Sequence, residues 1–70
     1  MVRLNGVEFS YSQGMSLEKL VDDYNAAQVK VFFDGFIVIV NDVAVDPLQA
    51  RERILNDNDK IVMIPYLDGG

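Results

Sequence analysis

The sequence contains no cysteine and no histidine. Without cysteine there is no disulfide framework, no thiol nucleophile and no zinc site built from thiolates. Without histidine, the commonest general base and the commonest metal ligand are also missing. We therefore expect a protein that is not an enzyme by itself and that binds no metal or cofactor of its own.

Positive charge is scarce. Six lysine and arginine residues stand against eleven aspartate and glutamate residues, which gives a net charge of −5. The basic residues are scattered from Arg3 to Lys60, so no basic face is expected to meet a nucleic-acid backbone. An acidic surface suits a basic patch on a partner protein instead. Protein partners are therefore expected, and nucleic acid is not.

Long hydrophobic runs are missing as well. No apolar stretch approaches the length that spans a bilayer, and the first residues lack the layout of a signal peptide. We therefore expect no membrane association and a cytoplasmic location. Half of the 70 residues are apolar, which is enough for one small globular domain.

The first part of the chain has clear local signals. Residues Val2–Asn5 and Val7–Tyr11 alternate apolar and polar side chains around Asn5-Gly6, which predicts two strands joined by a tight hairpin turn. Ser16 is placed to cap a helix. The apolar side chains of that helix recur with helical spacing and predict one buried face, made of Leu17, Leu20, Val21 and Tyr24.

The middle of the chain allows two interpretations. By local rules, Asp34-Gly35 is the turn of a second hairpin. In the alternative, the main strand covers residues 36–41 and turns at Asn41-Asp42 into a strand at Val43–Val45. We favour the alternative, which leaves residues 29–35 as a connection.

That connection is rich in aromatic residues. We expect it to pack Val31, and one or both of Phe32 and Phe33, under the helix. For Phe32, Phe33 and Phe36 a core position is favoured over an exposed docking patch, because isolated aromatic side chains usually pack.

A short helix is expected next. Asp46 is a suitable N-cap and Pro47 a suitable first helical residue, so the helix should begin there. We expect it to run to about Arg53, with Leu48 turned inward.

A polar turn introduces the last strand. Residues Asn56–Asp59 form a turn cluster in which Asn58 suits a left-handed conformation. A calcium loop is the alternative, but the glycine and distal glutamate of an EF-hand are missing. Ile61 and Met63 are expected in the core. Pro65 cannot donate a ladder hydrogen bond, so the strand should lie at an edge there or end, releasing residues 66–70.

The order of elements is strand, strand, helix, strand, strand, short helix, strand. This order predicts an α+β fold of the β-grasp (ubiquitin-like) type, with one main helix packed across a mixed sheet. We expect a single domain over residues 1–66 and a flexible tail over residues 67–70. The tail ends in Gly69-Gly70, which could thread a narrow tunnel and present the terminal carboxylate, or could be an ordinary frayed end.

Three stretches carry a family resemblance. Val40-Asn41 precedes a two-residue turn, Leu55–Val62 contains the polar turn, and the chain ends in Gly69-Gly70. Jointly they resemble the ubiquitin-like sulfur carriers of the ThiS and MoaD type, and the thiamin-biosynthesis carriers most closely. Asn58 stands where that family prefers glycine. Asp68 stands where it commonly has a small or polar residue, and its negative charge would weaken the approach to a nucleotide.

The resemblance implies a carrier rather than a catalyst. A partner similar to ubiquitin-activating enzymes would adenylate the carboxylate of Gly70 with ATP and magnesium, and sulfur from a cysteine-derived persulfide would replace AMP to leave a thiocarboxylate. A sulfur-accepting synthase, such as thiazole synthase, would be the second partner. Gly69 would be a spacer, and the rest of the tail in the partner's channel would be Asp68, Leu67 and Tyr66. Leu67 would be the apolar anchor, and the alternative for Leu67 and Tyr66 is closure of the core edge.

Other functions stay open beside delivery of sulfur for thiazole formation in thiamin biosynthesis. Pro65 is similar to the proline at the strand end of molybdopterin and tungstopterin carriers, which favours that related pathway. A protein modifier joined to lysines through Gly70, as ubiquitin is, belongs to a different class. The last alternative is an interaction module with an inert tail.

Overall fold

The computed structural model describes residues 1–28 and 30–66. Within these residues there are five strands, β1 (Val2–Leu4), β2 (Val7–Phe9), β3 (Phe36–Val40), β4 (Val43–Val45) and β5 (Lys60–Pro65). The two helices are α1 (Leu17–Ala27) and α2 (Pro47–Ala50). Within the described residues no helix has both the length and the apolar character needed to cross a lipid bilayer.

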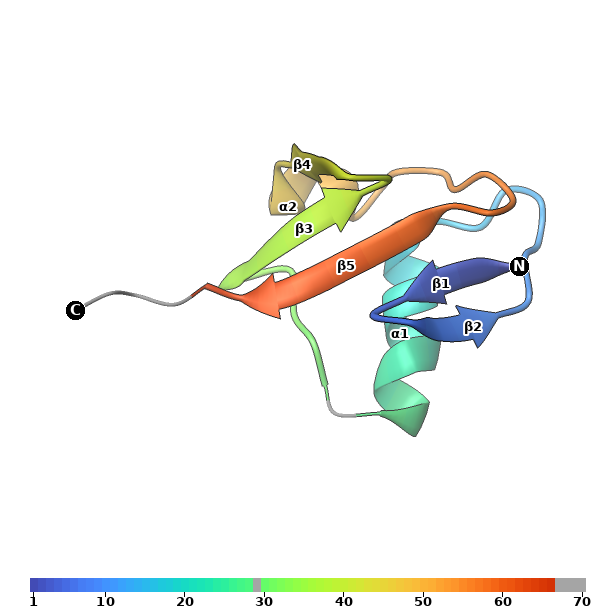
Figure 1. Ribbon diagram of the computed structural model, residues 1–70, viewed down its shortest axis with the longest axis horizontal. Helices are drawn as coiled ribbons and strands as arrows, with labels where there is room; N and C mark the ends of the chain where they lie inside the picture. The colour runs from blue at the N-terminus through green and yellow to red at the C-terminus, as the bar shows by residue number, and fades with distance from the viewer. Residues whose placement is uncertain (29, 67–70) are drawn as a thin grey trace.

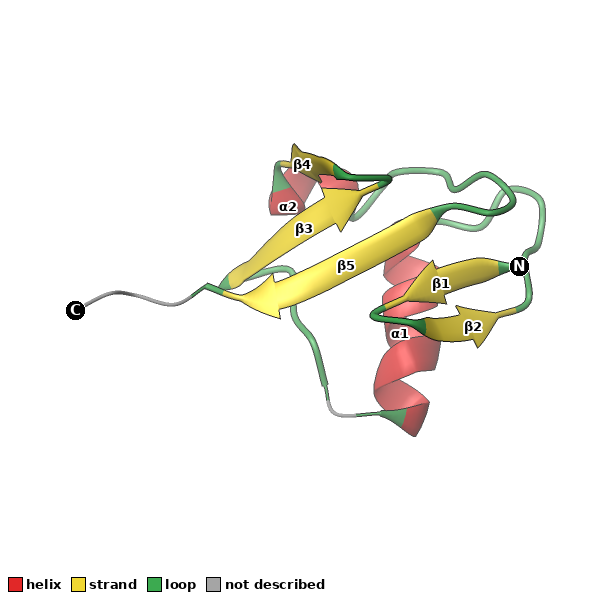
Figure 2. Ribbon diagram, in the orientation of Figure 1, coloured by secondary structure: helices red, strands yellow, loops and turns green. Residues whose placement is uncertain are grey.

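The strands form one mixed sheet in the order β2-β1-β5-β3-β4. β1 and β5 run parallel at its centre, with Leu4 opposite Ile61, and every other neighbouring pair is antiparallel. α1 crosses one face of this sheet, as Figures 1 and 2 show. The architecture confirms the predicted α+β fold, a mixed sheet with one main helix across it and a short second helix.

The first hairpin forms where the sequence predicts it. Asn5 and Gly6 both have positive φ angles, 50° and 83°, as a two-residue turn between twisted strands requires. Asn5 therefore belongs to the turn, and β2 ends at Phe9 rather than at Tyr11.

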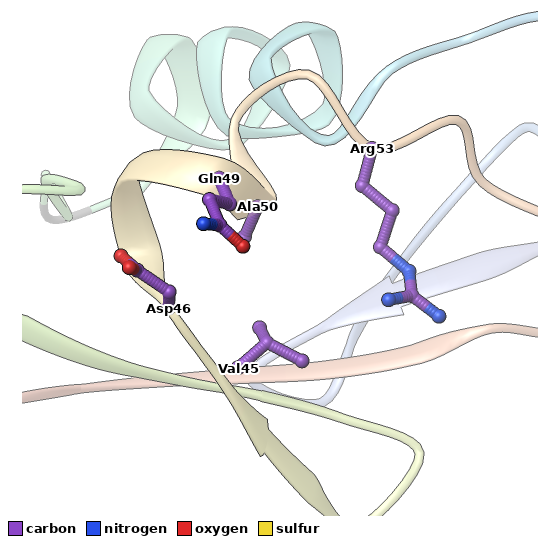
Figure 3. A pocket seen from close by; sticks show the side chains of 5 residues that line it. All are labelled: Val45, Asp46, Gln49, Ala50 and Arg53. Atoms are coloured by element: carbon purple, nitrogen blue, oxygen red, sulfur yellow. The ribbon is translucent and has the colours of Figure 1, made fainter.

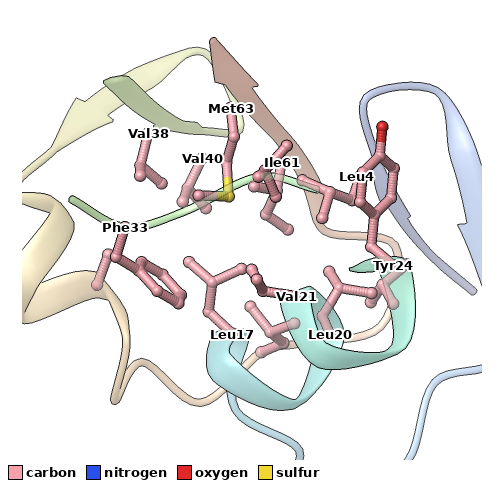
Figure 4. Close-up of a cluster of buried hydrophobic side chains, with 14 of the residues drawn as sticks. Leu4, Leu17, Leu20, Val21, Tyr24, Phe33, Val38, Val40, Ile61 and Met63 are labelled. Atoms are coloured by element: carbon pink, nitrogen blue, oxygen red, sulfur yellow. The ribbon is translucent and has the colours of Figure 1, made fainter. Parts of the chain in front are cut away.

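The predicted helix cap and buried face are confirmed. The Ser16 hydroxyl accepts a hydrogen bond from the Lys19 N–H at 3.2 Å, which satisfies one of the free donors at the start of α1. The buried face packs against the inner face of the sheet (Figure 4). The side chains labelled there are Leu4, Leu17, Leu20, Val21, Tyr24, Phe33, Val38, Val40, Ile61 and Met63.

The middle of the chain follows the favoured interpretation. β3 pairs with β4 across a turn in which Asn41 and Asp42 have φ angles of 49° and 70°. The hairpin at Asp34-Gly35 does not form, and residues 30–35 connect α1 to β3.

The prediction for the short helix was partly wrong. Asp46 caps it through a 3.0 Å bond from the Leu48 N–H, but α2 ends at Ala50, and the Leu48 side chain is 68% exposed while Ala50 is buried. The backbone beyond Ala50 is engaged elsewhere: the Arg51 and Arg53 carbonyls accept from the first N–H groups of α1, at 3.1 and 2.8 Å. These carbonyls accept from N–H groups that the start of α1 leaves without a partner inside the helix. They are therefore not available for the hydrogen bonds of a longer α2.

The prediction of a core position was right for Phe33 and wrong for Phe32. Val31 and Phe33 are buried and Phe36 is half-buried, but Phe32 is 54% exposed. The Asn25 side chain holds both backbone groups of Val31, at 2.8 and 2.9 Å. This clamp fixes the connection so that Val31 and Phe33 point inward and Phe32 lies between them facing out.

Candidate functional site

The predicted site is the C-terminal tail. Gly70, Gly69, Asp68 and Leu67 lie outside the described residues, and Tyr66 is the last residue the structure describes. The candidate site is therefore built from what surrounds Tyr66, because any partner that handles the tail must approach that part of the surface.

β5 continues further than Pro65 alone would suggest. Pro65 is its last residue and lies opposite Phe36, yet the Tyr66 N–H still donates to the Gly35 carbonyl at 2.8 Å. The prediction that the chain is released from residue 66 onward is thus wrong for the Tyr66 backbone. This bond holds the Tyr66 backbone against the start of β3.

One side of β5 near this point has no neighbouring strand. β1 pairs with β5 only as far as Ile61. Beyond it, the Asn5 side chain accepts from the Met63 N–H at 2.8 Å and donates to the Met63 carbonyl at 3.0 Å. Pro65, two residues on, faces the same side and has no N–H to offer. This open edge is therefore closed to strand addition by a side chain and a proline, two means by which sheets protect their edges.

The outer face of the sheet beside Tyr66 is apolar. Ile37 lies opposite Ile64 and Ile39 opposite Val62, and these four side chains point away from α1. A hollow of about 470 Å³ lies at the end of this strip, lined by Ile37, Ile64, Pro65 and Tyr66. We call this hollow and its four lining residues the exit surface.

Tyr66 is 68% exposed. The interpretation in which Tyr66 closes the edge of the core is therefore wrong. Its aromatic ring is accessible to a partner that approaches the exit surface, and aromatic side chains with a polar tip are favoured at such contacts.

Sequence reasoning missed the outer apolar strip. The signal was present: residues 36–40 are apolar without a break, as are residues 61–65. Strands that are apolar on both faces are typical of a sheet covered on both sides, and here α1 covers only one. An uncovered apolar face is a common sign of a partner surface.

The polar turn before β5, residues Asn56–Asp59, has a structural role. Asp59 is buried, and its carboxylate accepts from the Asn41 side-chain amide at 2.9 Å and from the Asn56 N–H at 2.8 Å. Asn58 has a φ of 73°, as predicted. Asp59 is thus committed to joining two turns, and the described residues hold no cluster of acidic side chains placed to bind a metal ion.

A shifted pKa among the described residues lies at the other end of β5 from Tyr66. The pKa of Asp57 is lowered because its carboxylate accepts a hydrogen bond from the N-terminal ammonium group of Met1. Asp57 is exposed, at the turn before β5. Among the described residues, the exit surface is lined by three apolar side chains and the phenol of Tyr66, so it is suited to binding.

A more polar hollow, of about 410 Å³, lies between β4 and α2 (Figure 3). Asp46, Gln49 and Arg53 line it together with Val45 and Ala50. The Asp46 carboxylate is already used to cap α2. This hollow shares no lining residue with the exit surface beside Tyr66, so it is not part of the candidate site.

The comparison with protein families gives one match. The model described as ThiS family matches residues 2–70, which include the predicted site residues. No curated protein matches the chain.

Proposed function

Since this chain belongs to the ThiS family of ubiquitin-like sulfur carriers, we propose that it carries sulfur on its C-terminal glycine and delivers it for thiazole formation in thiamin biosynthesis. Small carriers of this family have a β-grasp fold and are not enzymes themselves. The observation that carries the proposal is the family match itself, because it extends over the whole body and through Gly70.

The chemistry requires an activating partner. A carboxylate resists attack until a good leaving group is attached, so the Gly70 carboxylate first attacks the α-phosphorus of ATP and releases pyrophosphate. A persulfide then displaces AMP, and a thiol that cleaves the resulting S–S bond leaves the thiocarboxylate. Magnesium and ATP belong to the partner enzyme. The chain has neither cysteine nor histidine with which to perform these steps.

The folded part of the protein supports this role through the surface around Tyr66. β5 and the Tyr66–Gly35 bond hold Tyr66, the last described residue, beside an apolar exit surface. In the proposal, Leu67 and Tyr66 anchor the tail in the partner, Asp68 and Gly69 follow in the channel, and Gly70 reacts. The absence of a side chain on the two glycines allows close approach of the nucleotide.

Mass spectrometry of the intact chain tests the proposal. Incubated with ATP, magnesium, its adenylating enzyme and a persulfide donor, the chain should gain the mass of one oxygen-to-sulfur exchange. A variant lacking Gly70 should show no gain while its melting temperature stays unchanged. The enzyme is first shown to be active on a second carrier of the family. If the intact chain then gains no mass with this enzyme, the proposal is contradicted.

Delivery to molybdopterin is the second candidate function. Pro65 at the end of β5 favours it, because carriers of that pathway resemble this chain in a proline-containing strand end. The thiocarboxylated chain should be supplied separately to a thiazole-forming synthase and to a molybdopterin-forming one. Product from the second alone would replace the thiamin assignment.

A further inference from the structure

Phe32 is an exposed aromatic side chain that the fold does not need in its core. It is 54% exposed, between the buried Val31 and Phe33. Its ring meets the edge of Phe36, with 6.1 Å between the ring centroids and a 64° angle between the rings. One side of the Phe32 ring is therefore supported and the other faces outward.

Acidic side chains line a hollow beside Phe32. A hollow of about 290 Å³ separates α1 from the 30–35 connection, and Phe32 lines it together with three carboxylates, those of Glu18, Asp22 and Asp34. Arg51 holds the Glu18 carboxylate through two bonds of 2.8 and 3.0 Å. Within the described part of the chain, Asp22 and Asp34 have no ion-pair partner. The hollow thus combines an apolar wall with two uncompensated negative charges.

This surface is connected to the end of the described chain. Phe36, which supports Phe32, lies opposite Pro65, and the neighbouring Gly35 carbonyl holds the Tyr66 N–H. Four residues follow Tyr66, and a fully extended chain of that length reaches about 14 Å. An enzyme that grips the Gly70 carboxylate must therefore stand against the surface close to Tyr66.

We propose that Phe32, Asp22 and Asp34 form a docking surface for the adenylating enzyme, in which Phe32 enters an apolar depression and the two carboxylates meet lysine or arginine side chains. The inference rests on the proposed function, because that function supplies the adenylating partner. Such a partner binds the highly charged phosphates of ATP, so basic side chains line the approach to its active site. Acidic groups near the base of the tail complement that charge and orient the encounter.

The arrangement divides the contact between two sides of the place where the tail leaves. The exit surface lies on the outer face of the sheet, and Phe32 lies by α1 on the inner side. Contacts of the enzyme with both surfaces would fix how the carrier is oriented on the enzyme. Contact with the exit surface alone would leave this orientation less well defined. Phe32 is therefore a docking residue: it contributes to binding of the adenylating enzyme and does not touch the reacting atoms of Gly70.

The test uses the full chain and its purified adenylating enzyme, with pyrophosphate release measured against carrier concentration. Phe32→Ala should raise the KM for the carrier roughly tenfold, as the loss of an interface anchor does, while kcat stays unchanged. Phe32→Leu should recover most of this loss. Val43→Ala is the matched control, because Val43 is 62% exposed and begins β4, where it pairs with Val40 at the end of β3 away from Phe36.

The charged part of the surface is tested separately. The double variant Asp22→Asn and Asp34→Asn should raise the KM at low ionic strength, and the difference from the wild type should shrink in about 1 M salt, where the Debye length falls to about 3 Å. Thermal melting monitors the fold of each variant. These exposed carboxylates are independent of the core, so this double variant tests the surface even if Phe32→Ala is unstable.

The outcomes separate the two proposals. If the enzyme adenylates the wild type, and folded Phe32→Ala and the double asparagine variant both match it in KM, the docking surface is overturned and the carrier function stands. If the purified enzyme is active on a second carrier of the ThiS family but releases no pyrophosphate with this wild-type chain, the carrier function fails and the docking surface fails with it.

Discussion

Removing the Asn5 side chain should destabilise the protein through two separate effects. Asn5→Ala deletes both hydrogen bonds to Met63, which are part-buried and contribute about 0.5–1.5 kcal/mol each. It also places alanine at a φ of 50°, a left-handed conformation that asparagine tolerates better than alanine, at a cost of roughly 1 kcal/mol. The expected loss is about 2–4 kcal/mol. A chain of 70 residues has only about 4–10 kcal/mol in total, so the effect is large.

Urea denaturation followed by circular dichroism measures this loss. Asn5→Gly is the matched control, because glycine accepts the positive φ and removes only the two hydrogen bonds. It should cost about 1 kcal/mol less than Asn5→Ala. Asn5→Asp keeps the acceptor for the Met63 N–H and loses the donor to its carbonyl, so we expect an intermediate stability.

Two results would refute this reasoning. A loss below about 1 kcal/mol for Asn5→Ala would mean that water replaces the amide at the edge of β5. Equal stabilities for Asn5→Ala and Asn5→Gly would mean that the positive φ at this position costs alanine no free energy relative to glycine.

Three further predictions concern stability. Leu20→Ala in the core should cost about 2–5 kcal/mol in urea denaturation, whereas Leu48→Ala on the surface should stay within about 0.5 kcal/mol of the wild type. Asp59→Ala leaves two donors without their acceptor and should cost about 1–3 kcal/mol by the same measurement; a smaller loss would deny the carboxylate its role in joining the turns. The pKa of Asp57 is lowered by the N-terminal ammonium group, so its contribution to stability is complete above the unfolded value of 3.8 and disappears as the pH falls through the lower folded value. Melting temperatures measured from pH 6 to about pH 2 should therefore fall less steeply for Asp57→Asn, and an unchanged profile would contradict this.

Strong local signals made much of the fold predictable. Asn5-Gly6 specified a turn with two positive φ angles, and Ser16 and Asp46 specified helix starts, because each acts through bonds to residues at most three positions away. The end of α2 depended on the Arg51 and Arg53 carbonyls binding α1, a contact between distant parts of the chain. No local pattern contains that information. The prediction that Leu48 points inward was wrong for a different reason. A single helical turn has too few residues to define an apolar face.

The candidate site was predictable to a smaller extent. The sequence pointed to the place where the chain leaves β5, and Tyr66 is exposed there. The roles of the four residues after it stay a prediction. Phe32 was misassigned because an irregular connection has no period to tell inward from outward positions, and the Asn25 clamp on Val31 that decides it bridges helix and loop. Composition shows that the segment is aromatic, but tertiary contacts choose which ring stays outside.

The parallel pairing of β1 with β5 also bears on how the molecule is made. Among the described strands, β5 comes last in the sequence and lies at the centre of the sheet, and Leu4 finds its partner only when Ile61 is available. Such distant pairings raise the contact order, which slows folding. On the ribosome, the β1–β2 hairpin and α1 emerge before β5, the strand that joins them to β3. Their apolar faces therefore stay exposed to solvent until β5 is made. We therefore expect this sheet to assemble in one late step, after Pro65 has left the ribosome, rather than piece by piece during synthesis.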